Sequence, residues 1–271
     1  MKKVALVTGA SSGIGESTAI LLHNAGFTVY GAARGVERMK KLEEKGISTI
    51  SLDVTNEDSI SGCVKTIMEK EGRIDVLVNN AGYGSYGAIE DVPLEEARRQ
   101  FDVNIFGLAR LTQMVLPGMR ENRFGKIVNV SSMGGKVFTP FGGWYHATKH
   151  ALEGWSDCLR IEVEPFGIDV VVVEPGGIKT PWGQIAADNL RKTSGNGAYA
   201  GQANRTAEGM EKMYGSNRLT RPDAIGNVIL KAVTVRSPRR RYVKGMGARP
   251  TMFIRKVFGD GVYERAIKMA M

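Results

Sequence analysis

The start of the chain holds the feature that most restricts its fold. A short apolar run at 3–7 passes into the glycine-rich turn 8–15, and a helical pattern follows over 17–25. Glycines in such a turn let the backbone approach a pyrophosphate closely, and the amino end of the helix offers unpaired N–H groups and a positive dipole end. Strand, glycine turn and helix in this order predict a dinucleotide site in an α/β sheet.

Apolar runs alternate with helical patterns along the rest of the chain. Further strands are expected at 28–33, 47–52, 74–78, 126–130, 169–173 and 241–243, and helices at 36–45, 59–71, 94–120, 142–163 and from Arg221 onward. Strands that are apolar throughout and separated by helices indicate a parallel sheet covered on both faces. The chain is therefore predicted to be α/β, with a doubly wound parallel sheet (Rossmann fold) in a single domain.

Two segments depart from this alternation. Residues 1–249 are expected to form the Rossmann-fold catalytic domain, in which 181–219 is predicted to be a mobile substrate flap with one helical stretch at 206–214. Residues 250–271 are expected to form a basic amphipathic C-terminal extension. The apolar residues of this extension are spaced for one helical face: Met252, Phe253, Ile254, Val257, Phe258, Val262, Tyr263 and Ile267.

The formal charge of +9 is concentrated at the end of the chain. From 236 to 271, ten Lys and Arg residues stand against two acidic residues, whereas the preceding part holds 27 basic and 26 acidic residues. Basic amphipathic helices serve several purposes. A helix docked on the body of the protein is the favoured interpretation, peripheral contact with a membrane surface or lipid is the second, and nucleic acid is not expected as a partner.

Composition narrows the class of protein. Charged residues at 24% and hydrophobic residues at 42% are typical of a soluble globular enzyme. The two cysteines, Cys63 and Cys158, belong to no metal-ligand spacing or disulfide framework. The start of the chain lacks the apolar segment of a signal peptide, and no run of about 18 apolar residues is long enough to span a bilayer. We therefore expect a cytoplasmic protein.

Arg34 stands at the end of the second expected strand, where chains that prefer NAD carry an acidic residue. A guanidinium at this position matches a 2′-phosphate in geometry and charge. The sequence therefore favours NADP(H) as the cofactor, and the other interpretation is an arginine that only faces solvent. Arg38, one helical turn further on, is a second candidate for the same phosphate.

Tyr145 and Lys149 share one face of an expected helix, because residues four apart lie about 6 Å apart between Cβ atoms. An unperturbed tyrosine titrates near pH ~10, and a cation within about 4 to 6 Å lowers such a pKa by roughly one to three units. We therefore expect Lys149 to lower the pKa of Tyr145 into a range useful for acid/base catalysis. His146 and His150 have a zinc-chelating spacing, but the glutamate of that motif is absent and no metal is expected.

In their order along the chain, these motifs resemble the short-chain dehydrogenase/reductase family in its classical form. The matching residues are the turn from Thr8 to Gly15, Asp53-Val54, Asn79 to Gly82, Asn104, Ser131-Ser132, Tyr145 with Lys149, and Pro175 to Thr180. Within the family the chain is most similar to NADP-preferring enzymes such as 17β-hydroxysteroid dehydrogenase and acyl-dihydroxyacetone-phosphate reductase. That narrower similarity lies in 174–182 and in the extended C-terminus.

The resemblance implies roles for individual residues. Ser132 would hold the carbonyl oxygen of the substrate, and Tyr145 would protonate that oxygen as hydride arrives from the nicotinamide. Lys149 would bind the ribose hydroxyls and lower the pKa of the phenol, and Asn104 would complete a relay through water. The implied cofactor-binding residues are Gly9, Ser11, Ser12, Gly13, Ile14, Gly15, Arg34, Asp53, Val54, Asn80, Ala81, Gly82, Tyr145, Lys149, Pro175, Gly176, Ile178 and Thr180.

Family members are commonly dimers or tetramers, so the resemblance also implies a homo-oligomer built through the helices 94–120 and 142–163. The chain is thus predicted to be an NADP(H)-dependent oxidoreductase that interconverts a ketone and a secondary alcohol. Apolar residues near the expected pocket favour a bulky substrate such as a steroid, retinoid or acyl lipid: Tyr83, Tyr86, Val137, Phe138, Phe141, Trp144 and Trp182. The alternatives are a reductase of a carrier-bound 3-oxoacyl chain and a non-catalytic NADP(H)-sensing scaffold.

Overall fold

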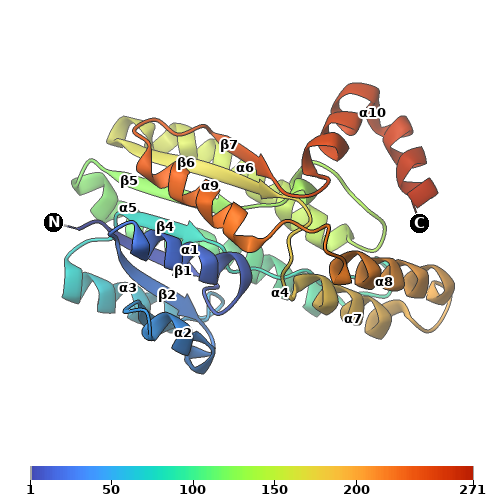
Figure 1. Ribbon diagram of the computed structural model, residues 1–271, viewed down its shortest axis with the longest axis horizontal. Helices are drawn as coiled ribbons and strands as arrows, with labels where there is room; N and C mark the ends of the chain where they lie inside the picture. Colours follow the sequence, from blue (N-terminus) through green and yellow to red (C-terminus); the bar gives the residue numbers. More distant parts are fainter. Residues whose placement is uncertain (1, 271) are drawn as a thin grey trace.

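The computed structural model describes residues 2–270. Seven strands form one sheet in the order β3-β2-β1-β4-β5-β6-β7 (Figure 1). They are β1 (Val4–Thr8), β2 (Thr28–Ala33), β3 (Ser48–Ser51), β4 (Val76–Asn79), β5 (Gly125–Val130), β6 (Ile168–Pro175) and β7 (Arg241–Lys244). Every neighbouring pair is parallel. The predicted doubly wound sheet is confirmed, and its order reverses at β1 and β4, where ligands of such folds bind.

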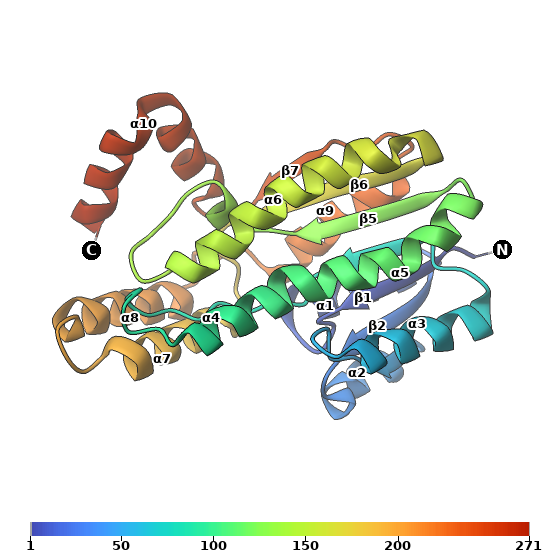
Figure 2. The same ribbon diagram turned by 180° about the vertical axis from the view of Figure 1, so that it is seen from behind.

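Helices cover both faces of the sheet. One face carries α1 (Gly13–Asn24), α2 (Lys40–Glu43) and α9 (Pro222–Thr234), as Figure 1 shows, and the other carries α3 (Glu57–Glu71), α5 (Leu108–Glu121) and α6 (Gly143–Val163), as Figure 2 shows. Successive side chains of a strand point to opposite faces. In β1, Ala5 and Val7 therefore pack in the first core layer and Val4 and Leu6 in the second.

The long helix predicted at 94–120 is interrupted. A π-helical turn, η2 (Asp102–Gly107), separates α4 (Leu94–Phe101) from α5. A Cβ atom on Gly107 would overlap the carbonyl oxygen of Val54, so the chain passes unusually close to the end of β3 at this point. Such turns are rare and often mark functional sites. In a similar way, the helix predicted at 36–45 is a 3₁₀ turn, η1 (Val36–Met39), followed by the short α2.

The predicted flap at 181–219 contains more helix than expected. Two helices, α7 (Trp182–Ser194) and α8 (Ala200–Gly215), lie side by side beyond the carboxyl ends of the strands (Figures 1 and 2). Small residues form the contact between them, where Ala186, Ala187, Ala203 and Ala207 are fully buried. The expectation of a single helical stretch at 206–214 was therefore wrong.

The C-terminal extension is also different from its prediction. Helix α10 (Ala248–Ala270) begins just before the expected boundary and is broken at Gly259, whose φ of 75° and ψ of 178° are not helical. The two halves form an arch at the same end of the molecule as α7 and α8 (Figure 1). The extension does contact the body, through Arg255 and Tyr263. The single continuous apolar face is wrong, because a helical stripe cannot continue in register across the break.

No helix within residues 2–270 is both long enough and apolar enough to cross a membrane.

Candidate active site

The glycine turn between β1 and α1 is shaped to receive a phosphate group. Gly9 and Gly13 adopt positive φ values of 65° and 59°, which other residues rarely adopt. A Cβ atom on Gly15 would overlap the carbonyl oxygen of Gly9, so only glycine fits there. Ser12 caps α1 without a side-chain hydrogen bond to the helix. The first N–H groups of α1 are therefore open to an anion.

Side chains from β4 hold this turn in place. The amide of Asn80 donates to the carbonyl oxygen of Thr8 at 2.9 Å, and the backbone N–H groups of Asn80 and Ala81 both donate to the Thr8 hydroxyl at 3.0 Å. A Cβ atom on Gly13 would lie 2.9 Å from the methyl group of Thr180. The implied residues from β1, β4 and the segment after β6 therefore meet at one edge of the sheet.

Arg34 lies exposed at the end of β2, and no acidic side chain within residues 2–270 forms an ion pair with it. Burial opposes ionisation of Asp53, but hydrogen bonds from Thr55 and the positive charges of Arg34 and Arg99 hold the pKa of Asp53 below its ordinary value. The guanidinium of Arg34 is thus near Asp53 and free to bind a phosphate. Together with the open turn, it makes the site a fit for a dinucleotide with a 2′-phosphate.

The remaining wall of this edge follows β6. A Cβ atom on Gly176 would overlap the carbonyl oxygen of Met246, so the Pro175-Gly176 turn packs tightly against the segment after β7. Ile178 is buried, with 4% of its surface exposed, and Gly13 lies close to Thr180. Of the four residues expected at the nicotinamide, Pro175, Gly176, Ile178 and Thr180, Thr180 lies next to the glycine turn.

Tyr145 and Lys149 lie on α6, and Ser132 lies opposite them at the start of the 3₁₀ turn η3 (Met133–Gly135). The ammonium nitrogen of Lys149 is 6.0 Å from the centre of the Tyr145 ring and donates to the carbonyl oxygen of Val130 at 3.0 Å. Ser132 accepts a hydrogen bond from the N–H of Gly134 at 3.0 Å. Three of the four side chains predicted to be catalytic therefore converge at the end of β5.

The predicted lowering of the Tyr145 pKa is wrong in this structure. Burial raises the pKa of Tyr145 to about 12, although the Ser132 hydroxyl lowers it. Burial also lowers the pKa of Lys149 to about 8, against the attraction of Glu153. The physical reason is that both groups are withdrawn from water, which disfavours phenolate and ammonium alike. At neutral pH the phenol of Tyr145 therefore keeps its proton.

Asn104 lies in the π-helical turn η2, which directs its side chain toward the site. Its amide nitrogen donates to the carbonyl oxygen of Tyr83 at 2.9 Å and to the Thr148 hydroxyl at 3.1 Å, and its oxygen accepts from the Tyr83 N–H. A Cβ atom on Gly82 would lie 3.0 Å from this oxygen and 3.8 Å from the Lys149 nitrogen. The Asn104 oxygen and the Lys149 nitrogen therefore both lie beside Gly82.

Aromatic rings cover Tyr145. The ring of Trp182 lies 5.2 Å from that of Tyr145, and Tyr86 lies 6.0 Å from it. Tyr214, on α8, extends this wall at 6.1 Å from Trp182. The sequence analysis did not single out Tyr214, because no local pattern indicates that α8 folds back over the site.

The residues expected to line one apolar pocket lie in different parts of the structure. Tyr86 and Trp182 contact Tyr145, but Phe138 packs against Tyr263 of α10 at 5.2 Å and Trp144 packs against Phe101 at 6.4 Å. The expectation was therefore wrong for Phe138 and Trp144. Trp144 instead borders an outer groove of about 530 Å³ lined by Leu94, Ala97, Arg98, Phe101, Asp102, Phe106 and Trp144.

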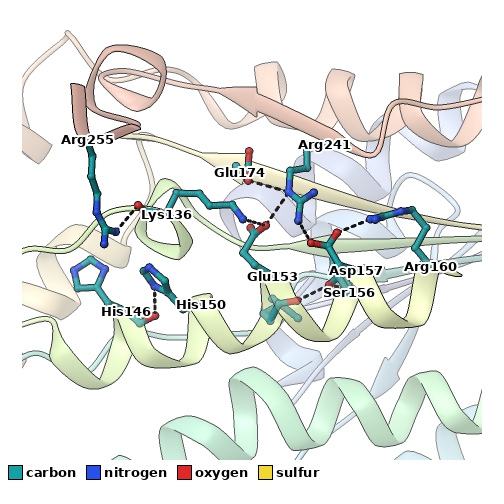
Figure 3. Close-up of polar contacts among 12 residues, drawn as sticks. Lys136, His146, His150, Glu153, Ser156, Asp157, Arg160, Glu174, Arg241 and Arg255 are labelled. Atoms are coloured by element: carbon teal, nitrogen blue, oxygen red, sulfur yellow. Dashed lines mark hydrogen bonds and ion pairs between the residues drawn. The ribbon is translucent and has the colours of Figure 1, made fainter. Parts of the chain in front are cut away.

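A buried group of charges, centred on Glu153, continues the face of α6 that carries Tyr145 and Lys149 (Figure 3). Glu153 pairs with Lys136 and Arg241 at 3.0 Å, and Arg241 also lies 3.5 Å from Glu174. Burial, and then the negative charge of Glu153, raise the pKa of Glu174 to about 7. The sequence analysis missed Glu153, although its position four residues after Lys149 is a signal that could have found it.

His146 is fully engaged in hydrogen bonds. Its Nε2 accepts from the N–H of Thr139 at 3.0 Å, so its Nδ1 carries the proton and donates to the carbonyl oxygen of Gly134 at 3.0 Å. The His150 ring binds the carbonyl oxygen of His146 at 2.9 Å. The pair therefore anchors the loop before α6. Among residues 2–270, no group of three or more His, Cys, Asp or Glu side chains is arranged to hold a metal ion.

Comparison with known proteins gives consistent matches. Residues 3–190 match the family model described as short chain dehydrogenase. The chain is 40% identical over 245 residues to a 3-ketodihydrosphingosine reductase from Bacteroides thetaiotaomicron, covering 90% of this chain and 88% of that protein. It is 34% identical over 252 residues to an NADPH-dependent 3-dehydrocapnine reductase from Ornithobacterium rhinotracheale, covering 89% of this chain and 87% of that protein.

Solved structures agree with this match. A short-chain dehydrogenase from Streptomyces avermitilis is 36% identical to this chain and superposes with a TM-score of 0.81, covering 93% of this chain and 92% of that one.

Proposed function

Because the chain belongs to the short-chain dehydrogenase family, we propose that it is an NADP(H)-dependent oxidoreductase that interconverts a ketone and a secondary alcohol. The observation that carries this proposal is the convergence of Ser132, Tyr145 and Lys149 beside a turn that is open to phosphate. The exposed Arg34 and the NADPH-dependent relative support the choice of cofactor.

Different residues at this edge of the sheet bind different parts of the cofactor. Gly9 and residues 11–15 bind the pyrophosphate, and Arg34 binds the 2′-phosphate. Asp53 and Val54 border the adenine, and Asn80, Ala81 and Gly82 border the adenosine ribose. Pro175, Gly176, Ile178 and Thr180 form the nicotinamide wall. NADPH supplies the hydride that reduces the ketone.

Side chains of the protein orient the ketone and move the proton. The Ser132 hydroxyl donates a hydrogen bond to the carbonyl oxygen, and Tyr145 transfers its phenolic proton to that oxygen. The raised pKa of Tyr145 means that the phenol carries this proton at neutral pH. The aromatic wall formed by Tyr86, Trp182 and Tyr214 excludes water from this proton.

Lys149 and Asn104 complete the catalytic group. Lys149 binds the ribose hydroxyls, and its positive charge favours the phenolate that is left after Tyr145 has given up its proton. Asn104 holds a water molecule that returns a proton to this pair. The hydrogen bonds of Asn104 to Tyr83 and Thr148 support this positioning role.

We infer that the substrate is a ketone on a long, apolar lipid chain. The names of two relatives describe reductases of 3-keto compounds, 3-ketodihydrosphingosine and 3-dehydrocapnine. The aromatic wall over Tyr145 supports an apolar substrate, since rings offer large contact areas to aliphatic groups.

The test is NADPH consumption by the purified protein with a panel of ketones. The panel contains a long-chain 3-keto amino lipid, a steroid ketone, a retinal, a carrier-bound 3-oxoacyl chain and a polar keto sugar. We expect the highest kcat/KM with the long-chain 3-keto lipid. A preference for the carrier-bound chain or the sugar would contradict the proposed substrate, and no turnover of any ketone would contradict the proposed enzyme.

The protein is further proposed to be a homo-oligomer, formed through the outer faces of α4, α5 and α6. Phe106, on η2, and Ile161, on α6, are 61% and 67% exposed, which is unusual for such large apolar side chains. The groove beside Trp144 lies on the same side of the molecule and offers a second apolar contact. Cytoplasmic location is likewise part of the proposal.

A further inference from the structure

Helix α10 presents a cluster of apolar side chains to solvent. Phe253, Val257, Phe258 and Val262 are between 46% and 58% exposed. The rings of Phe253 and Phe258 pack against each other edge to face, with their centres 6.4 Å apart. Single exposed apolar residues are common on protein surfaces, but a contiguous group marks an interaction site.

The opposite side of α10 is fixed to the body of the protein. Arg255 donates to the carbonyl oxygen of Lys136 at 2.6 Å and lies 4.7 Å from the centre of the Phe138 ring. Tyr263, which is 2% exposed, donates to the carbonyl oxygen of Phe138 at 2.8 Å. These contacts hold both halves of the arch against the loop between β5 and α6. The exposed cluster therefore faces outward in a defined direction.

The break at Gly259 is required for this arrangement. Its φ of 75° lies in the region that favours glycine, and nothing lies within 4 Å of a Cβ atom built on it. The conformation of the backbone, and not crowding, therefore reserves this position for glycine. The break turns the second half so that Tyr263 meets Phe138, while Phe253 and Phe258 stay exposed on the first half.

The helix that carries the exposed cluster also carries an excess of positive charge. The basic residues of α10 that are exposed are Arg249, Lys256, Arg265 and Lys268. Of the two acidic residues of the helix, Asp260 is paired with Arg255 at 3.0 Å, which leaves Glu264. A helix that exposes both apolar side chains and cations matches the interface of an anionic membrane, where the apolar side chains enter the acyl boundary and the cations meet lipid phosphates.

We propose that the outer face of α10 docks on an anionic phospholipid surface. A second copy of this chain fits less well, because a two-fold contact between identical faces would bring the same cations together. The arch lies at the same end of the molecule as α7 and α8, which cover Tyr145 (Figures 1 and 2). Docking would therefore bring the catalytic end of the molecule to the membrane, whatever ketone the enzyme reduces.

The test is co-sedimentation of the full chain with vesicles of phosphatidylcholine, alone or mixed equally with phosphatidylglycerol. We expect binding to the mixed vesicles and little binding to phosphatidylcholine alone. Binding should weaken at high salt because the contact is partly electrostatic. The double variants Phe253→Ser with Phe258→Ser, and Lys256→Glu with Arg265→Glu, should each bind at least roughly tenfold more weakly.

Matched controls are Met68→Ser, an exposed apolar residue on α3, and Lys45→Glu, an exposed basic residue before β3. Both should bind vesicles like the unaltered protein, and circular dichroism should show that all variants are folded. No binding to mixed vesicles, or equal binding by the α10 variants, would overturn the proposal. Light scattering without vesicles tests the other occupant. If the Phe253→Ser, Phe258→Ser variant formed a smaller particle than the unaltered protein, the outer face of α10 would be a contact with a second copy of the chain, and the proposal would be overturned.

Discussion

Tyr145 has an environment in which burial outweighs the neighbouring cation. Its ring is enclosed by Trp182 and Tyr86, and its pKa rises to about 12 although Lys149 is only one helical turn away. Desolvation acts on every buried charge, whereas a lysine that is itself desolvated provides less stabilisation. At neutral pH the phenol of Tyr145 therefore carries its proton.

Arg34 is predicted to determine the choice between NADPH and NADH. Arg34→Ala should weaken NADPH binding roughly tenfold to a hundredfold, because a hydrogen bond to a charged group contributes about 1.5–3 kcal/mol, and should leave NADH binding nearly unchanged. The measurement is the fluorescence titration of each cofactor. Arg110→Ala, which removes the exposed partner of Glu57, is the matched control. Equal losses for NADPH and NADH would contradict the role of Arg34.

Glu174 is predicted to make stability depend on pH. Its pKa is raised from 4.5 to about 7 in the folded protein. The stability that Glu174 contributes is therefore fully present below about pH 4.5 and is lost as the pH rises through about 7. Glu174→Gln removes this titration. The unfolding free energy of the variant, measured in urea, should therefore rise relative to the unaltered protein between about pH 5 and about pH 8.

Glu44→Gln, at an exposed carboxylate after α2, is the control for that experiment and should show no such change. If the unfolding free energies of Glu174→Gln and the unaltered protein differed by the same amount at every pH from about 5 to about 8, the titration of Glu174 would not be the cause of the pH dependence.

At the scale of elements, the unit formed by β1, the glycine turn and α1 depends on backbone contacts that leave no room for a side chain. The Gly15 position illustrates this, since its Cβ would overlap the Gly9 carbonyl. Gly15→Ala is therefore expected to force the turn open, lowering both NADPH affinity and the melting temperature. Gly62→Ala, in α3 with nothing within 4 Å of the new Cβ, should instead stabilise the protein by up to about 1 kcal/mol. Similar melting temperatures for the two variants would contradict this account.

The regular elements could be predicted because their signals are local. The strand expected at 28–33 is β2, and the helix expected at 142–163 differs from α6 by one residue. Continuous apolar runs and helical spacing are properties of short windows of sequence. The same is true of the glycine turn and of Tyr145 with Lys149.

The irregular elements could not be predicted, since their causes lie elsewhere in the chain. The π-helical turn η2 exists where Asn104 binds Tyr83 and Gly107 meets Val54. Helices α7 and α8 are held together by buried alanines, which taken alone resemble a flexible loop. The break in α10 places its two halves against Phe138, a contact between residues 125 positions apart.

At the scale of the whole molecule, the two uncovered apolar surfaces have different expected partners. The outer faces of η2 and α6 display Phe106 and Ile161 and are predicted to join copies of the chain. Phe106→Glu with Ile161→Glu should therefore give a smaller particle in light scattering, because like charges would meet in the contact. Met68→Glu, on α3, is the control. An unchanged particle size would contradict this interface.

The central claim is that this chain reduces a ketone with a proton from Tyr145. The most direct measurement is the rate of NADPH oxidation by Tyr145→Phe with the best ketone of the panel. Tyr242→Phe, the same change on β7, is its control. We predict a fall in kcat of roughly 10² to 10⁴-fold with NADPH binding retained. A rate for Tyr145→Phe equal to that of the unaltered protein would contradict the claim.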